Sequence, residues 1–242
     1  MTITTLFFDL DDTLCDTQKA DEKAIESLIS HVKNYFNEYK LCQQFANRYL
    51  AGIYKTLSTK EKIKLLPIHN EEIFRIDLIK LIAEDLGCEL SEKEASSIQR
   101  YFDQQRQHHL DFYPQIQQWL LSLRSKFKLV VITNGPVFSQ KIKIEAVNLS
   151  AYVDHILIGG AEKEQKPAVS IFEKALLLSE SNPSQVIHFG DKLETDVLGA
   201  NRAGIHSVWI SHGKNLVGDI KPKDILLHSQ AMIDYVANFY QS

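Results

Sequence analysis

Short apolar runs that alternate with helical patterns constrain the fold of this chain more than any other feature. One run opens the chain, the others fall in its second half, and each ends at polar or glycine residues. The runs predicted as strands are 3–8, 128–133, 155–158, 186–189 and 207–210. The helices predicted with them are 138–149, 168–178, 195–203 and 229–239. Such alternation implies right-handed crossovers, and it therefore predicts an α/β core built on a parallel sheet.

A region with a different composition separates the first run from the others. Over about residues 17–111 glycine is scarce, charge is frequent, and apolar residues recur at helical spacing, as at Ile25, Leu28 and Val32. The segment 57–69 contains a proline and is predicted to be a connection between helices. No strand pattern occurs in this region, so the sequence predicts that it is helical.

These patterns predict two structural units. The first is a Rossmann-like α/β core formed by residues 1–16 and 112–242, and the second is a helical cap inserted over residues 17–111. Ligands of parallel sheets bind outside the carboxyl ends of the strands. Polar residues gather at those ends in this chain, so we expect the active site there, between core and cap.

The composition argues against several classes of partner. The chain has 27 basic and 31 acidic residues and a net charge of −4, which gives no general electrostatic reason for nucleic-acid binding. No stretch approaches the ~20 apolar residues of a membrane span, and the N-terminus lacks the pattern of a signal peptide. Three irregularly spaced cysteines, Cys15, Cys42 and Cys88, predict reduced thiols. We therefore expect a cytoplasmic protein without nucleic-acid or membrane partners, whose oligomeric state stays open, a monomer included.

Two carboxylates follow the first predicted strand at a spacing of two. A turn after the strand can aim Asp9 and Asp11 into one site. One can attack phosphorus to form a covalent aspartyl-phosphate, while the other handles the proton of the leaving group. The alternative is an acidic loop that caps the next element, because aspartate favours caps and turns.

Potential phosphate-binding groups follow the second strand. Thr133 and Asn134 offer a hydroxyl and backbone N–H groups that can hold phosphoryl oxygens in front of a helix. Lys166, which precedes a proline, can balance the charge of a phosphoryl group. Taken singly, the first pair also suits an ordinary strand–helix turn, and the lysine also suits the solvated surface.

Three carboxylates are predicted at one edge of the sheet. Asp191 and Asp196 follow the strand 186–189 and join Asp9 there. Crowded like charges favour a hard divalent cation, and Mg²⁺ prefers oxygen ligands. The alternative assigns Asp191 to a helix N-cap and Asp196 to the surface.

Together these pieces resemble the haloacid-dehalogenase superfamily, whose four motifs lie at successive strand ends. Here the motifs read DLDDT at 9–13, TNG at 133–135, KP at 166–167 and GDKLETD at 190–196. Within the superfamily, the core is similar to the N-acylneuraminate-9-phosphatase family, whereas the cap is similar only in part. The segments that carry this second likeness are FFDLDDTLCDT at 7–17, ITNG at 132–135, KIEAVNLSAYVDHILIGG at 143–160, KPAVSIF at 166–172 and GDKLETDVLGANRAG at 190–204.

The resemblance implies catalytic roles for four residues. Asp9 corresponds to the nucleophile, Asp11 to the general acid and base, Thr13 to the residue that orients Asp11, and Lys166 to the charge-stabilising lysine. Dehalogenases that act on carbon lack the second aspartate, so Asp11 favours phosphorus chemistry. P-type ATPases share the nucleophile but need membrane helices.

The resemblance also implies binding roles. Thr133 and Asn134 correspond to phosphate contacts. Asp191 corresponds to a Mg²⁺ ligand and Asp196 to a direct or water-mediated one. The set of metal ligands is completed by Asp9 and the backbone carbonyl of Asp11.

The substrate implied is a small sugar phosphate, with N-acylneuraminate 9-phosphate as the best single name. Arg106, three residues before His109, lies in a similar R-x-x-H arrangement and is the candidate partner for the carboxylate of such a substrate. A solvated surface arginine is the alternative. A nucleotide 5′-phosphatase on the same scaffold, or a catalytically silent binding protein, are the other functions considered.

Overall fold

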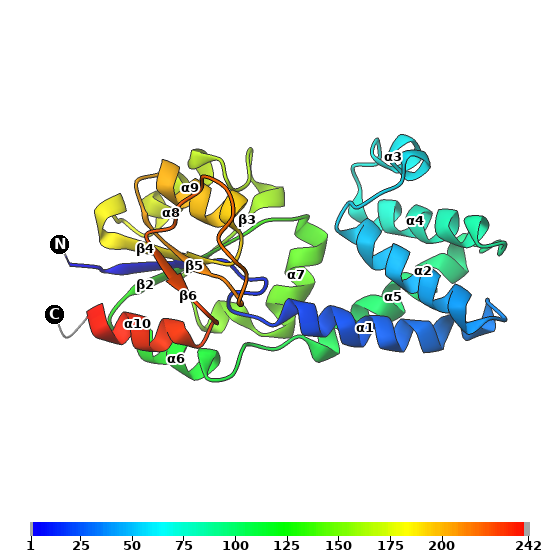
Figure 1. Cartoon of the computed structure of the whole chain (residues 1–242), viewed down its shortest axis with the longest axis horizontal. Helices are drawn as coiled ribbons and strands as arrows, with labels where there is room; N and C mark the ends of the chain where they lie inside the picture. The colour runs from blue at the N-terminus through cyan, green and yellow to red at the C-terminus, as the bar shows by residue number, and fades with distance from the viewer. Residues whose placement is uncertain (1, 240–242) are drawn as a thin grey trace. The chain divides into compact units, whose positions relative to one another are not determined.

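A computed structural model describes residues 2–239, so residues 1 and 240–242 of the predicted core lie outside the described residues. The chain divides into two compact units. One comprises Met1–Thr17 with Leu110–Ser242, and the other comprises Gln18–His109. We call them the α/β unit and the helical unit (Figure 1).

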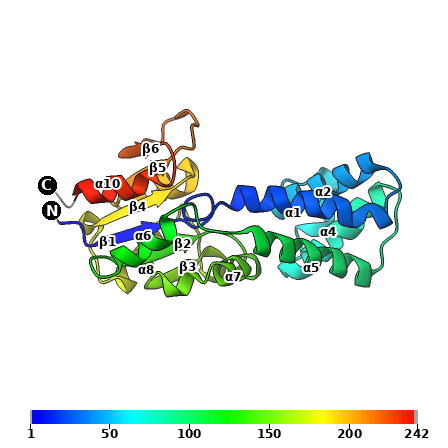
Figure 2. The ribbon, with the colours of Figure 1, turned by 90° about the horizontal axis from the view of Figure 1, so that it is seen from below.

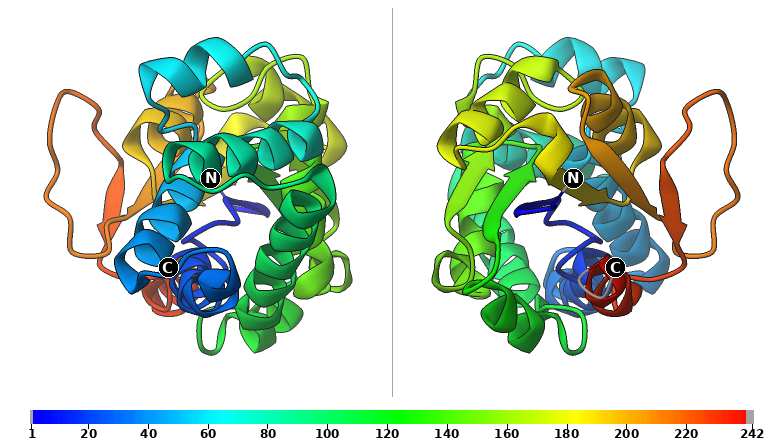
Figure 3. Two further views of the ribbon diagram at one scale, coloured as in Figure 1. Left: turned by 90° about the vertical axis from the view of Figure 1, so that its right-hand side faces the viewer. Right: turned by 90° about the vertical axis from the view of Figure 1, so that its left-hand side faces the viewer.

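The α/β unit contains one parallel sheet of six strands in the order β3-β2-β1-β4-β5-β6. The strands are β1 (Thr5–Phe8), β2 (Lys128–Thr133), β3 (His155–Ile158), β4 (Val186–Gly190), β5 (His206–Ile210) and β6 (Asp224–Leu226). This sheet confirms the predicted fold class. Strand β6 was not predicted, because it has only three residues and lies at the edge of the sheet (Figure 3). Its Ile225 is half exposed.

Helices cover both faces of this sheet (Figure 1). They are α6 (Ile116–Leu123), α7 (Val137–Ala146), α8 (Val169–Leu178), α9 (Leu198–Arg202) and α10 (Ala231–Phe239). Successive side chains of a strand point to opposite faces. Phe7 accordingly packs with Phe172 of α8, whereas Phe8 contacts Trp119 of α6 edge to face.

The helix predicted over 195–203 begins differently. A π-helical turn, Leu193–Val197, precedes α9, and the N–H groups of Asp196 and Val197 both donate to the carbonyl of Lys192. The wide turn brings Asp196 so close to Gly190 that a Cβ added to this glycine would lie 2.3 Å from the Asp196 Cβ. A side chain at position 190 would therefore displace Asp196.

The helical unit contains five α-helices, one short 3₁₀ helix (Val32–Asn34) and no strand among residues 18–109. The α-helices are α1 (Thr17–His31, which starts at the last residue of the α/β unit), α2 (Tyr39–Ile53), α3 (Thr59–Leu65), α4 (Glu71–Asp85) and α5 (Glu92–His109). The four long helices pack as a bundle (Figure 2) around an apolar core that includes Leu28, Phe45, Leu78 and Phe102. No helix within residues 2–239 combines the length and the apolar character needed to cross a membrane.

The prediction that residues 57–69 form only a connection is wrong, since this segment contains α3. A capping box starts the helix: the Ser58 side chain accepts from the N–H of Glu61, and the Glu61 carboxylate accepts from the N–H of Ser58. This pair satisfies two N–H groups at the helix start, which outweighs the turn signal of the proline that follows.

Candidate active site

The carboxyl ends of β1, β2 and β4 lie side by side, because β1 is hydrogen-bonded to both neighbours. Asp9 directly follows β1, and its backbone N–H donates to the carbonyl of Phe189 at 2.8 Å. Thr133 is the last residue of β2, and Asp191 directly follows β4. The sheet therefore brings together side chains that are far apart in the sequence.

Lys166 connects two of the predicted carboxylates. Its Nζ lies 2.6 Å from Asp9 Oδ1, 2.6 Å from Asp196 Oδ1 and 2.5 Å from the carbonyl of Ile132, so each of its three donors has an acceptor. Burial alone would lower the pKa of Lys166, but Asp196 and Asp9 outweigh it and raise that pKa above its usual range. The lysine is thus a buried cation, and the alternative of a solvated surface residue is wrong.

Asn134 holds the backbone of this lysine. Its Nδ2 donates to the Lys166 carbonyl at 2.8 Å, and its Oδ1 accepts from the Lys166 N–H at 3.0 Å. Thr133 is fully buried, and within the described part of the chain its hydroxyl makes only a long contact of 3.4 Å with the Asn134 carbonyl. The Asn134 side chain therefore positions Lys166, and the phosphate contacts expected of Thr133 and Asn134 stay a prediction.

Three buried carboxylates form a compact group. One oxygen each of Asp9, Asp191 and Asp196 lie within 4.8 Å of one another. Within residues 2–239, Asp191 Oδ1 is buried and has no hydrogen-bond partner. Burial raises the pKa of Asp9 to about 7 against the effect of Lys166, and burial with the charges of Asp9 and Asp196 raises that of Asp191 to about 8. An all-oxygen set with an unsatisfied buried oxygen fits a Mg²⁺ ion.

Asp196 differs from the other two carboxylates because both of its oxygens are engaged. Oδ1 accepts from Lys166 and lies 3.3 Å from Nε2 of His188, and Oδ2 accepts from the N–H of Lys192 at 3.1 Å. Burial would raise the pKa of Asp196, but Lys166 and His188 outweigh it and hold this pKa well below its usual range. The alternative of a surface aspartate is wrong, because Asp196 is 1% exposed.

Asp11 is held by residues outside the four sequence motifs, for which no role was predicted. Lys143 Nζ lies 2.7 Å from both carboxylate oxygens, Gln140 Nε2 donates to Oδ2 at 3.1 Å, and Thr17 Oγ1 donates to Oδ1 at 2.6 Å. The hydroxyl of Thr13, which was expected to orient Asp11, is buried and has no partner among the described residues. The sequence does contain a signal for Gln140 and Lys143: they are two polar residues three positions apart in the helix after the TNG motif.

Residues 6–210 match the family model described as haloacid dehalogenase-like hydrolase. The chain belongs to this family. N-acylneuraminate-9-phosphatase of Mus musculus is 30% identical over 214 residues, which cover 85% of this chain and 82% of that protein. Glyceraldehyde 3-phosphate phosphatase of Pyrococcus furiosus is 28% identical over 233 residues, which cover 92% of this chain and 86% of that protein. These matches confirm the predicted superfamily and the prediction of a hydrolase of the phosphatase type.

Solved structures of the family have the same fold. YfnB from Bacillus subtilis, a hydrolase solved with bound magnesium, has a TM-score of 0.71 and 18% identity, and the match covers 98% of this chain and 99% of that one. A phosphatase from Thermococcus onnurineus has a TM-score of 0.64 and 19% identity, with 97% and 98% covered. At these identities the likeness concerns the fold alone.

Arg106 of this hydrolase lies in the helical unit and is buried, so the alternative of a solvated surface arginine is wrong. Its Nε lies 2.5 Å from Asp21 Oδ1, and its Nη2 donates to Asp21 Oδ2 at 3.1 Å and to the Tyr54 hydroxyl at 2.7 Å. The guanidinium fork therefore already binds a carboxylate of its own unit.

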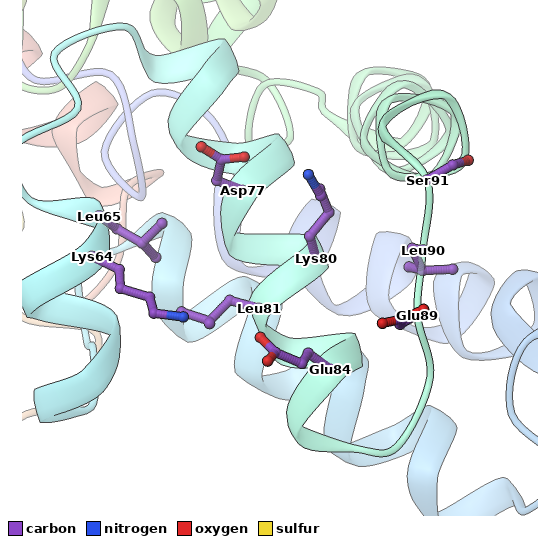
Figure 4. A pocket seen from close by; sticks show the side chains of 9 residues that line it. All are labelled: Lys64, Leu65, Asp77, Lys80, Leu81, Glu84, Glu89, Leu90 and Ser91. Atoms are coloured by element: carbon purple, nitrogen blue, oxygen red, sulfur yellow. The ribbon is translucent and has the colours of Figure 1, made fainter.

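The helical unit of this hydrolase also has a cavity of about 630 Å³ between α3, α4 and the segment that precedes α5 (Figure 4). Its apolar lining comes from Leu65, Leu81 and Leu90, and its charged lining includes Asp77 and Lys80. None of the predicted site residues lines it. The cavity therefore gives no support to any of the predicted roles.

Proposed function

We propose that this protein is a Mg²⁺-dependent phosphomonoesterase in which Asp9 is the covalent nucleophile. The observation that carries the proposal is the position of Asp9. Its Oδ1 lies 2.6 Å from Lys166 Nζ, and its carboxylate belongs to the buried group that includes Asp191. The lysine supplies a fixed positive charge where the phosphoryl group would bind, and such preorganised charge dominates catalysis of phosphoryl transfer.

The reaction has two halves. In the first, an oxygen of Asp9 attacks phosphorus, the bond from phosphorus to the ester oxygen breaks, and Asp11 gives its proton to the departing oxygen. In the second, water attacks the aspartyl-phosphate, its proton passes to Asp11, and the bond between phosphorus and Asp9 breaks to release inorganic phosphate. Asp11 thus returns to its protonated form, and Lys166 faces the phosphoryl charge in both halves.

Asp9, Asp191 and the backbone carbonyl of Asp11 are the residues that would hold Mg²⁺. When bound, the ion supplies positive charge that offsets the phosphoryl oxygens and the crowded carboxylates. Asp196 would contact it through water, because both Asp196 oxygens already accept hydrogen bonds. The choice of Mg²⁺ as the ion agrees with the magnesium bound to YfnB, which has the same fold.

For the substrate we favour N-acylneuraminate 9-phosphate. Support comes from relatives of that name in three mammals, which are 28–30% identical, and from Arg106 in its R-x-x-H arrangement. A substrate carboxylate would have to compete with Asp21 for the guanidinium. That pairing favours a second candidate, a smaller sugar phosphate without a carboxylate, of the kind named in the archaeal relatives.

The cellular location is proposed to be cytoplasmic. The support is that Cys15, Cys42 and Cys88 are all free thiols and that Cys15 and Cys42 are buried.

Release of inorganic phosphate from an aryl phosphate in the presence of Mg²⁺ tests the central proposal. Asp9→Asn should abolish turnover, because the amide keeps the shape of the side chain but is not a nucleophile here. Asp12→Asn, in the same loop, is the matched control and should stay active, since asparagine tolerates the positive φ of 56° at this position. Substantial turnover by Asp9→Asn would contradict the covalent mechanism. Initial rates of hydrolysis of N-acylneuraminate 9-phosphate, glyceraldehyde 3-phosphate and nucleoside 5′-monophosphates then decide the substrate.

A further inference from the structure

Helix α7 contributes three buried polar side chains that none of the four motifs contains, namely Ser139, Gln140 and Lys143. Gln140 and Lys143 are each 4% exposed and lie three residues apart, so they share one face of the helix. Burying a lysine is unfavourable unless its charge is paired and hydrogen-bonded. The position of Lys143 is therefore explained by its partner, and that partner is Asp11.

The contacts fix the direction of the Asp11 carboxylate. Lys143 is equidistant from both oxygens, at 2.7 Å, while Thr17 and Gln140 each donate to one of them. The Gln140 amide also donates to the Asn134 carbonyl at 2.9 Å, which ties the arrangement to the loop after β2. These four hydrogen bonds come from donors on two helices, α1 and α7, and they leave the carboxylate little rotational freedom.

We propose that Lys143, assisted by Gln140, is a positioning residue that orients Asp11 as the base of the second half-reaction. This inference rests on the proposed function. The four hydrogen bonds fix the plane of the Asp11 carboxylate, and a base must be held in one direction to take the proton of the water that attacks the aspartyl-phosphate.

Aryl phosphates separate the two halves, because a good leaving group departs without a proton. For such a substrate kcat/KM reports the steps up to formation of the aspartyl-phosphate, whereas kcat includes its hydrolysis. Lys143→Met should therefore lower kcat by about 100-fold, within the usual range for loss of acid–base assistance, and change kcat/KM by less than about 3-fold. The aspartyl-phosphate should accumulate, so rapid quenching should show a burst of phenolate close to one equivalent of enzyme.

Lys141→Met is the matched control, since Lys141 lies on the same helix but is exposed. It should behave as the wild type. A methylammonium or ethylammonium salt should partly restore kcat in Lys143→Ala and leave Lys141→Ala unchanged, an effect that a merely structural lysine would not show. If Lys143→Met does not fold, as judged by circular dichroism, Gln140→Ala tests the same idea and should give a smaller loss of kcat with the same burst.

The outcomes distinguish this inference from the proposed function. Equal losses of kcat and kcat/KM without a burst, or no loss at all, would overturn the role of Lys143 while Asp9→Asn remains inactive. An active Asp9→Asn variant and the absence of any phosphorylated wild-type enzyme would overturn the proposed function itself.

Discussion

The ionised form of Asp191 should destabilise the metal-free protein, and replacing this residue by asparagine should reveal by how much. The folded protein raises the pKa of Asp191 from 3.8 to about 8, through burial and the charges of Asp9 and Asp196. Between these two pH values the unfolded chain has lost the proton while the folded chain keeps it. The folded state therefore binds more protons, and the free energy of unfolding falls as the pH rises.

The size of the effect follows from the same pKa. A rise from 3.8 to about 8 corresponds to a ceiling on the order of 5 kcal/mol once the carboxylate is ionised, and we expect roughly half of it because Asp9 shares the repulsion. The amide introduced by Asp191→Asn is neutral at every pH. At pH 8 and without metal, the variant should thus melt about 5–10 °C above the wild type. Near pH 4.5 the two proteins should melt at similar temperatures.

Differential scanning calorimetry of chelator-treated protein between pH 4.5 and pH 8 measures this difference. Saturating Mg²⁺ should raise the melting temperature of the wild type, more at pH 8 than at pH 5.5 because protons compete for the same oxygens, and it should have little effect on the variant. Asp219→Asn, at an exposed carboxylate, should leave both curves unchanged. A variant that is less stable than the wild type at pH 8, or a difference that does not depend on pH, would refute the reasoning.

Three further predictions concern the catalytic groups and the helical unit. Activity should require Mg²⁺ and be poorly supported by Ca²⁺, because the longer bonds and larger number of ligands of Ca²⁺ disturb the attack geometry. Phosphate release after exhaustive chelation checks this prediction. Full activity of the chelated protein would contradict it. Asp11→Asn should slow the hydrolysis of an alkyl phosphate at least about 10-fold more than that of an aryl phosphate, because only the alkoxide leaving group needs a proton. Equal losses of the two rates in parallel initial-rate assays would assign Asp11 another role. Arg106→Ala should lower the free energy of unfolding by about 3–5 kcal/mol, because it leaves the buried Asp21 without its ion-pair partner. The double variant Arg106→Ala with Asp21→Asn should recover much of this loss. Urea denaturation measures both variants, and a single variant as stable as the wild type would argue against the ion pair.

The parallel sheet could be predicted from sequence because its central strands are unambiguous. All four residues of β1 are buried: the β-branched Thr5 is followed by three apolar residues, and the run ends abruptly at Asp9. Strand β6 offers no such signal, since its residues are partly exposed and it pairs with only one neighbour. Helix α3 was missed for a related reason: its start depends on hydrogen bonds between Ser58 and Glu61, which a pattern of apolar residues does not record.

The candidate site was predictable to the extent that chemistry concentrates at strand ends. The sequence pattern led to Asp9, Asp191 and Asp196, and these side chains do meet in the structure. Lys143 and Gln140 could not be found in this way, because they lie on a helix face and their partner, Asp11, is more than 120 positions earlier in the chain. Their polar character on a buried face has meaning only once the fold brings Asp11 to them.

The distribution of charge at the strand ends explains why the metal is expected beside Asp191 in particular. Lys143 pairs with Asp11, and Lys166 pairs with both Asp9 and Asp196. Among the described residues no ion pair is formed by Asp191, which has the unsatisfied buried oxygen and the pKa raised to about 8. Around the metal position, the three carboxylates of Asp9, Asp191 and Asp196 and the Lys166 cation leave two negative charges, which is the charge that one Mg²⁺ offsets. A site that is neutral before the substrate binds allows a phosphoryl dianion to approach a carboxylate nucleophile, so the lysines and the metal position together make the attack by Asp9 electrostatically feasible.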